Sequence, residues 1–151
     1  MEIKILNKEF YKEYKLPRYA TTGSAGLDLR STSDFTITPG NIFAVRTGIA
    51  VHIGSDYWLP DNYVGIITPR SGWGSAGLVL ANTLGIIDED YQGEIVLNMW
   101  NRNEDVHLHV HKGDRIAQLI FMPIFKPSFE LVEEFNETTV RGFGGFGSTG
   151  E

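Results

Sequence analysis

Short runs of alternating or continuous apolar residues, each closed by Gly, Pro, Asn or Asp, recur along the whole chain. Helical periodicity is scarce, so the dominant signal is the period of two that is typical of β-strands. Many short strands separated by turn signals predict an all-β jelly roll, sandwich or barrel. The expected strands are 2–6, 26–30, 35–37, 42–51, 64–68, 78–80, 94–101, 105–110 and 115–122, and one short helix is expected to begin near Ser71.

Charge and the lack of cysteine exclude several classes of protein. The 151 residues carry a formal net charge of -6 without a local basic patch, which argues against binding a nucleic-acid polymer. With no cysteine, the chain has no disulfide, thiolate metal site or cysteine nucleophile. The first residues include many charged side chains. The longest run without a charged residue, 71–87, is interrupted by glycines. We therefore expect neither a signal peptide nor a membrane contact, and we predict a cytoplasmic protein.

Glycine is concentrated in two stretches, 72–77 and 142–150, which hold eight of the 17 glycines. Each contains a GxGxxG pattern, but neither lies between a strand and a helix with an acidic residue further on, as a dinucleotide site requires. The second stretch belongs to residues 138–151, which are poor in aliphatic side chains. They are expected to form a flexible tail after a domain of residues 1–137. Two phenylalanines in this tail leave open a segment that becomes ordered on binding.

Three histidines, His107, His109 and His111, alternate in sequence and would point to one face of a strand. Three imidazoles on one face suit zinc. The apolar residues between them are equally typical of an ordinary strand whose histidines face solvent, and this interpretation is favoured.

Two further segments carry groups that are suited to catalysis or to ligand binding. The acidic turn in 86–94 predicts a hairpin arm carrying Asp88, where a carboxylate can orient and deprotonate a water molecule, although the segment alone favours a solvated turn. Residues 69–72 (PRSG) combine a cation, a hydroxyl and backbone N–H groups, which suits phosphate. An N-capping Ser71 beside a surface Arg70 explains the same residues without a ligand.

Taken together, these segments resemble the five ordered motifs of the trimeric dUTPases, the deoxyuridine triphosphate nucleotidohydrolases. The resemblance spans nearly the whole chain, and five motifs in the same order are much more specific than one. It implies a jelly-roll (β-clip-like) subunit in a homotrimer whose active sites lie at subunit interfaces. The motifs are 25–30 (AGLDLR), 69–72 (PRSG), 82–93 (NTLGIIDEDYQG), 113–119 (GDRIAQL) and 141–148 (RGFGGFGS).

The resemblance implies hydrolysis of dUTP to dUMP and pyrophosphate by water attack at the α-phosphorus. This reaction limits uracil incorporation into DNA and supplies dUMP for thymidylate synthesis. By their places in the motifs, Asp88 is expected to activate the water and Arg141 to act as an arginine finger on the tail. Asp28 is expected to hold Mg²⁺ through its waters.

The same resemblance implies the residues that bind the nucleotide. Asn82 and the backbone after it resemble the hairpin that pairs with uracil, and Tyr91 resembles the platform under the deoxyribose. Arg70 and Gln118 belong to the phosphate-binding set, while Phe146 resembles the tail residue that covers the base. The full set expected to bind substrate is Arg70, Ser71, Gly72, Asn82, Ile86, Ile87, Asp88, Tyr91, Gln118, Arg141, Phe146 and Gly147.

Two alternatives remain on the same fold. A dCTP deaminase of the same superfamily typically has a catalytic glutamate where this chain has Asn98. A non-catalytic regulatory trimer is the other. The chain also departs from many dUTPases at Trp73, where they carry a smaller aliphatic residue.

Overall fold

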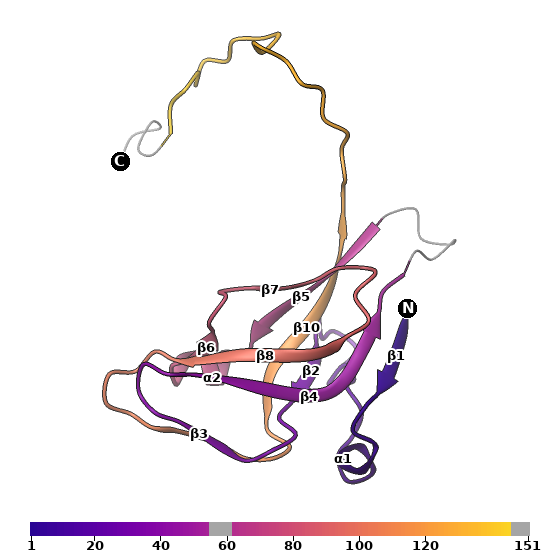
Figure 1. The fold of residues 1–151 in the computed structure, drawn as a ribbon, viewed down its shortest axis with the longest axis vertical. Helices are drawn as coiled ribbons and strands as arrows, with labels where there is room; N and C mark the ends of the chain where they lie inside the picture. The colour runs from indigo at the N-terminus through magenta and orange to yellow at the C-terminus, as the bar shows by residue number, and fades with distance from the viewer. Residues whose placement is uncertain (55–61, 146–151) are drawn as a thin grey trace.

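The computed structural model describes residues 1–54 and 62–145, and most of its regular structure is β-strand (Figure 1). Neither of the two helices in these residues is long and apolar enough to cross a membrane. The elements are β1 (Glu2–Ile5), α1 (Lys8–Glu13), β2 (Leu27–Arg30), β3 (Phe35–Ile37), β4 (Ile42–His52), β5 (Asn62–Pro69), α2 (Ser71–Ser75), β6 (Leu78–Leu80), β7 (Gly85–Ile87), β8 (Glu94–Asn101), β9 (Leu108–Val110) and β10 (Arg115–Ile124).

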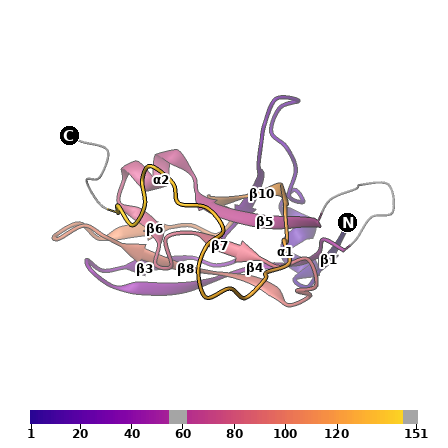
Figure 2. The same cartoon turned by 90° about the horizontal axis from the view of Figure 1, so that it is seen from above.

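The strands form two four-stranded sheets and one two-stranded ribbon. The first sheet has the order β1-β4-β8-β6, the second has the order β2-β10-β5-β7, and β3 pairs with β9. Every pairing is antiparallel. Figure 2 shows β5 and β10 of the second sheet above β4 and β8 of the first. The expected all-β class is confirmed, with two sheets packed face to face.

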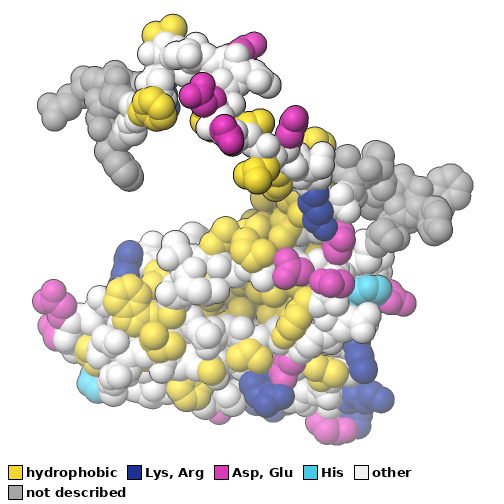
Figure 3. All heavy atoms as spheres, turned by 45° about the horizontal axis from the view of Figure 1, so that its top comes forward, with side chains coloured by type: hydrophobic (Ala, Val, Ile, Leu, Met, Phe, Trp, Pro, Cys, Tyr) yellow, Lys and Arg dark blue, Asp and Glu magenta, His cyan; other side chains and the backbone are white. Residues whose placement is uncertain are grey.

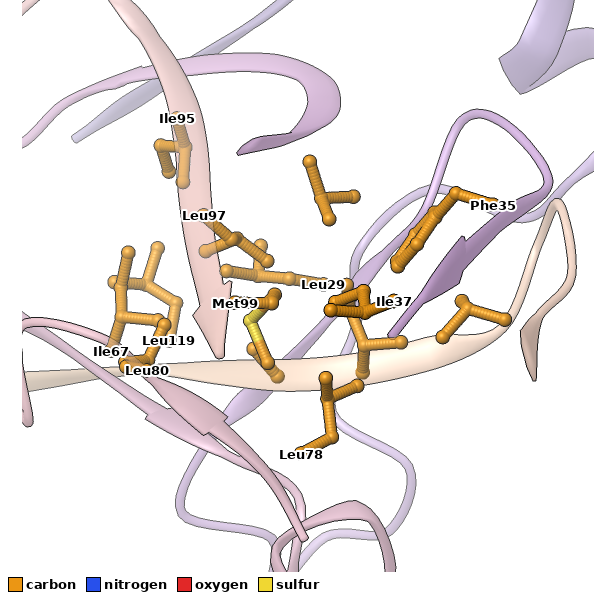
Figure 4. Packing of buried hydrophobic residues seen from close by; sticks show 14 of the residues in the cluster. Leu29, Phe35, Ile37, Ile67, Leu78, Leu80, Ile95, Leu97, Met99 and Leu119 are labelled. Carbon is orange, nitrogen blue, oxygen red and sulfur yellow. The ribbon is translucent and has the colours of Figure 1, made fainter. Parts of the chain in front are cut away.

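The core lies between these sheets and follows from alternation along the strands. In β8, Ile95, Leu97 and Met99 are at most 1% exposed, and the residues between them lie on the outer face. Leu29 of β2 and Leu119 of β10 complete the cluster from the other sheet (Figure 4). Burial of each such side chain is worth about 1.5–3 kcal/mol. A slip of one residue would turn this whole face to solvent, so the apolar pattern determines the register.

All nine expected strands are present, and those at 35–37, 78–80 and 94–101 have the expected bounds. The strand expected to start at residue 105 begins only at Leu108. Asn101, which is fully buried, donates to the carbonyl of Val106 (2.7 Å) and holds the connection as a loop. β7 adds a tenth strand, but the hairpin expected in this segment was wrong, because β7 pairs with β5 in the second sheet whereas β8 belongs to the first.

The structure contains a second helix, α1, so the prediction of a single helix was wrong. Asn7 caps α1 by accepting a hydrogen bond from the backbone N–H of Phe10 (3.0 Å), and Phe10 is buried. Six residues are too few to show helical periodicity, and tertiary contacts rather than propensity stabilise so short a helix. The helix α2 begins at Ser71, as expected.

The aromatic side of α1 lies on the turn that precedes β10. The rings of Phe10 and Tyr14 stack with centroids 4.5 Å apart, and Lys112 Nζ lies 5.4 Å from the Tyr14 centroid. Gly113 in this turn has a φ of +91°, and a Cβ added there would lie 2.1 Å from Tyr14 Cε1. Glycine is therefore required beneath this ring.

Gly113→Ala is expected to lower the free energy of unfolding by about 2–4 kcal/mol, because it combines left-handed backbone strain with a steric clash. Gly40→Ala is the matched control. Gly40 has a φ of +72° with no atom within 4 Å of its Cβ position, so only the backbone cost applies there. Urea unfolding of both variants measures the difference. Equal losses would show that Tyr14 does not restrict position 113.

Regular structure ends at Ile124, and residues 125–145 extend away from the two sheets (Figures 1 and 3). This segment exposes large apolar side chains, among them Phe129, Leu131 and Phe143 at 93%, 101% and 105%. Such surface is unfavourable in water and is typical of a segment that meets another surface. The domain boundary expected between residues 137 and 138 stays a prediction.

Candidate active site

A pocket of about 240 Å³ opens beside β7 and β8 and brings together one half of the predicted site. Its apolar floor includes Ile67, Leu80 and Leu97. It contains none of the residues expected to bind phosphate or metal. The five predicted residues that line it are Asn82, Ile86, Ile87, Asp88 and Tyr91.

One wall of the pocket is formed by β7, which is an edge strand: among the described residues it is the last strand of its sheet and pairs with β5 alone. Gly85 makes this pairing close: a Cβ there would lie 2.9 Å from Cβ of Ile67. Before β7, Asn82 closes a tight turn by donating from Nδ2 to the carbonyl of Leu84 (3.1 Å). An edge strand leaves one row of backbone N–H and C=O groups unpaired, and these can recognise a flat polar ring.

Tyr91 is held at both ends of the turn between β7 and β8. Its backbone N–H donates to the carbonyl of Asp88 (3.2 Å), and its hydroxyl donates to the carbonyl of Glu94 (2.9 Å). The ring lies against Gly93, where a Cβ would be 2.5 Å from the Tyr91 hydroxyl oxygen. The glycine of this motif therefore allows the ring to occupy its place.

Asp88 lies directly after β7 at the rim of the pocket and is exposed. Within residues 1–54 and 62–145, its side chain makes no ion pair and no hydrogen bond. Its neighbour Glu89 is engaged with Lys126 (2.8 Å). Asp88 therefore has a carboxylate that is accessible to water, as a general base requires.

The other predicted residues belong mainly to an ionic cluster on β2, on β10 and at the N-cap of α2. Asp28 accepts hydrogen bonds from Arg70 through Oδ1 and from Arg115 through Oδ2, the latter at 3.0 Å. Gln118 is opposite Asp28 in the pairing of β10 with β2. Burial, together with the charge of Arg115, lowers the pKa of Arg70 from its usual value. The cluster presents two guanidinium groups around one carboxylate.

Arg115 was not among the predicted site residues. The sequence shows Arg115 only as a cation that follows the turn of the fourth motif. The pairing of β10 with β2 is what brings it to Asp28. A shared carboxylate keeps two like charges close together, which suits a polyanion.

Ser71 and Gly72 occupy the first turn of α2 and are exposed. The N-cap is Arg70, with φ of -69° and ψ of 144°, and its side chain makes no capping hydrogen bond. The alternative of an N-capping Ser71 is therefore wrong, and the exposed Ser71 directly follows Arg70 of the ionic cluster. Trp73, the departure from the family pattern, is partly buried against the core.

The histidine strand matches the ordinary interpretation. His107, His109 and His111 are exposed, whereas Leu108 and Val110 are buried. Among the described residues, no group of three or more His, Cys, Asp or Glu side chains is placed to hold a metal ion.

Arg141 lies on the extended segment and does not contact either half of the site. Its Nε donates to the carbonyl of Gly144 (2.9 Å), within the segment itself. Figure 3 shows the segment standing apart from the body of the molecule. Phe146 and Gly147 lie outside the described residues. In a single chain, the predicted site residues are therefore divided among three places: the pocket, the ionic cluster and the extended segment.

Comparison with known proteins identifies the family. The dUTPase family model matches residues 12–150. The deoxyuridine 5'-triphosphate nucleotidohydrolase of Aeromonas hydrophila is 47% identical, over 99% of this chain and 96% of that protein. The protein of the same name from Acinetobacter baumannii is 46% identical, over 100% of this chain and 98% of that protein.

Solved structures agree as well. A dUTPase of Staphylococcus bacteriophage 80alpha with dUPNHPP has a TM-score of 0.82 and 30% sequence identity, covering 99% of this chain and 98% of that one. This likeness confirms the expected dUTPase-type jelly roll. With the family match over nearly the whole sequence and relatives of almost equal length, the chain belongs to the dUTPase family.

Proposed function

We propose that this protein hydrolyses dUTP to dUMP and pyrophosphate. The observation that carries the proposal is the pocket beside β7, which brings together Asn82, Asp88 and Tyr91, three residues predicted from one motif for three different tasks. The names of the relatives describe the same reaction. We infer that the enzyme works on the nucleotide pool of the cytoplasm, where it limits uracil incorporation into DNA and supplies dUMP.

In the proposed reaction, a carboxylate oxygen of Asp88 takes a proton from a water molecule. The water oxygen bonds to the α-phosphorus, and the bond from that phosphorus to the α,β-bridging oxygen breaks, so that pyrophosphate leaves. Asn82 and the β7 backbone, from Ile86 and Ile87, hold the uracil edge. Tyr91 packs under the deoxyribose. Positioning and charge stabilisation supply most of the rate enhancement in such a transfer.

The phosphates are assigned to the ionic cluster and the tail. Arg70 and Gln118 are close to the exposed Ser71 and Gly72, and together they offer charge and hydrogen-bond donors to a polyanion. Arg141 adds a further guanidinium when the tail closes, with Phe146 over the base and Gly147 beside it. Closure of this kind excludes water and completes the site only when substrate is bound.

A homotrimer with sites at subunit interfaces accounts for the division of the site in one chain. The pocket residues, the ionic cluster and Arg141 lie apart in a single subunit, so a complete site requires parts from neighbouring copies. The exposed apolar side chains of residues 125–145 also need a covering surface. Oligomers of identical subunits are usually closed and symmetric, which favours a ring of three over an open chain.

Mg²⁺ is the proposed cofactor, and Asp28 is the residue that would hold it through water. An ionised carboxylate has about four acceptor positions. Arg70 and Arg115 use two of them in this structure, which leaves acceptor positions for metal-bound waters. When bound, Mg²⁺ would neutralise phosphate charge and polarise the phosphoryl oxygens. A single carboxylate acting through water would be sufficient, because Mg²⁺ takes phosphate oxygens and waters as its ligands.

The structure gives no support to the deaminase alternative. Asn98 lines the pocket wall at the position where a deaminase needs a glutamate, and an amide cannot serve as its general base. The regulatory alternative lacks a supporting observation of its own.

We expect pyrophosphate release from dUTP with Mg²⁺, and a loss of at least about 10²-fold in rate when EDTA removes the metal. Rates with dTTP, dCTP and UTP are expected to be much lower. The methyl of thymine clashes with the β7 edge, cytosine presents a donor where uracil presents an acceptor, and Tyr91 excludes the ribose hydroxyl. A coupled pyrophosphate assay measures all four. Ammonia release from dCTP, or no turnover of dUTP at micromolar enzyme, would overturn the proposal.

A further inference from the structure

Glu94, the first residue of β8, connects the pocket to a bulge in the neighbouring strand β4. Its side chain is only 10% exposed. Oε1 accepts a hydrogen bond from the backbone N–H of Gly48 (2.9 Å), and Oε2 accepts one from Arg46. A buried carboxylate is costly unless its oxygens are satisfied, and here both oxygens have partners.

The bulge that receives Glu94 is itself held on several sides. Arg46 is opposite Val96 and Ala50 is opposite Glu94, so three residues of β4 face one residue of β8. At its centre Gly48 has a φ of +71°, and its carbonyl accepts hydrogen bonds from two backbone N–H groups that precede α1. The side chain of Glu94 is therefore anchored to a part of the backbone with little freedom.

A second anchor comes from α1. The hydroxyl of Tyr11 donates to the carbonyl of Thr47 (2.8 Å), and Thr47 Oγ1 donates to the carbonyl of Ile95 (2.7 Å). Burial raises the pKa of Tyr11 to about 12, so that its hydroxyl remains protonated, and hence a donor, throughout the neutral range. The bulge, α1 and the start of β8 thus form one connected network.

The main chain of Glu94 faces the other way, toward the pocket. Its carbonyl accepts the hydroxyl of Tyr91 (2.9 Å), and both residues line the pocket. One residue therefore links the β4 bulge, through its side chain, to the Tyr91 ring, through its carbonyl.

We propose that Glu94 is a positioning residue for sugar selectivity. Its side chain anchors the start of β8 to the β4 bulge, and its carbonyl, which accepts the Tyr91 hydroxyl, thereby fixes the position of the Tyr91 ring in the pocket. The inference rests on the proposed function, in which Tyr91 excludes the 2′-hydroxyl of ribose. It goes beyond that function because Glu94 does not touch the sugar itself. Discrimination by steric exclusion depends on ring placement to within a fraction of an ångström, and such placement requires supporting contacts behind the ring.

The test is the ratio of kcat/KM for dUTP to kcat/KM for UTP. Glu94→Ala removes both anchors of the side chain and is expected to lower this ratio roughly three- to tenfold. Glu94→Gln keeps an acceptor for the Gly48 N–H and is expected to retain most of the ratio. Glu2→Gln is the matched control, since Glu2 is 81% exposed on β1 of the same sheet and pairs only with His52 (3.2 Å). It is expected to behave as the unmodified protein.

Tyr91→Phe removes the hydroxyl that bonds to the Glu94 carbonyl and is expected to lower the same ratio. If both residues act through one link, the double variant Glu94→Ala with Tyr91→Phe loses clearly less than the product of the two single losses. Multiplicative losses would overturn the proposal, as would a Glu94→Ala protein with a lower melting temperature and an unchanged ratio. If Glu94→Ala does not fold, Tyr91→Phe still tests the link, because an unchanged ratio in that variant would overturn the proposal.

Amide hydrogen exchange gives a readout that is independent of dUTP. Faster exchange at Gly48 and Tyr91 in Glu94→Ala, compared with Glu2→Gln, is expected from the network. If the unmodified protein fails to turn over dUTP, the proposed function fails, and this exchange pattern still decides whether Glu94 positions Tyr91. Unchanged exchange at Tyr91 would overturn the positioning role even in an active enzyme.

Discussion

Asp88→Asn is expected to lower kcat for dUTP by roughly 10²- to 10⁴-fold while leaving the Kd for dUTP nearly unchanged. Asparagine has almost the same shape as aspartate but cannot take a proton from water. The carboxylate lies at the pocket rim immediately after β7, so its replacement leaves the β7 pairing with β5 intact. Single-turnover kinetics with pyrophosphate detection measures the first effect, and titration calorimetry with dUTP measures the second.

Asp90→Asn is the matched control for this experiment. It makes the same chemical change two residues further on, in the same exposed turn. Asp90 does not line the pocket, so the kcat of the Asp90→Asn variant is expected to equal that of the unmodified enzyme. Loss of dUTP binding in Asp88→Asn, or an equal fall in kcat in Asp90→Asn, would contradict the assignment of Asp88 as the base.

Removal of residues 141–151 is expected to lower kcat by about 10³-fold or more, the range attributed to arginine fingers in phosphoryl transfer. The fold should persist, because none of the residues 141–145 belongs to the buried core, and the proposed trimer is expected to persist with it. Pyrophosphate release measures turnover, and sedimentation velocity measures the assembly.

Two full-length variants separate the arginine from the rest of the tail. Arg141→Gln is expected to reproduce most of the loss, since it removes only the guanidinium. Glu137→Gln changes an exposed charge just before the tail and is expected to leave kcat unchanged. Full activity after truncation would remove the tail from the mechanism, and a monomer in sedimentation would contradict shared sites.

Local patterns were sufficient for much of the fold. The alternation of Ile95, Leu97 and Met99 predicted a strand with one buried face, and the structure has it between the expected bounds. The turn residues after Ile87 marked the end of a strand, and β7 ends there, although the hairpin expected with the next strand is absent because β7 pairs with β5. In both cases the information is contained in neighbouring residues, because side-chain period and turn chemistry are local properties.

Other features depend on contacts between distant parts of the chain. Arg115 and Arg70 meet on Asp28 because β10 pairs with both β2 and β5. Glu94 meets Gly48 across a bulge of β4, a contact between residues that no local pattern connects. Strand order and bulges determine these contacts, and single-sequence periodicity contains no information on either.

The sequence by itself determined the all-β class, the buried face of strands such as 94–101 and the identity of the family, because apolar alternation and the five ordered motifs are local features of the sequence. Only the tertiary structure decided which predicted residues share a pocket and which lie apart. It gathered Asn82, Asp88 and Tyr91 at the edge of β7, and it left Asp28 and Arg141 elsewhere. The physical reason is that a site forms where strands distant in the sequence pair, and where supporting contacts hold its side chains in position.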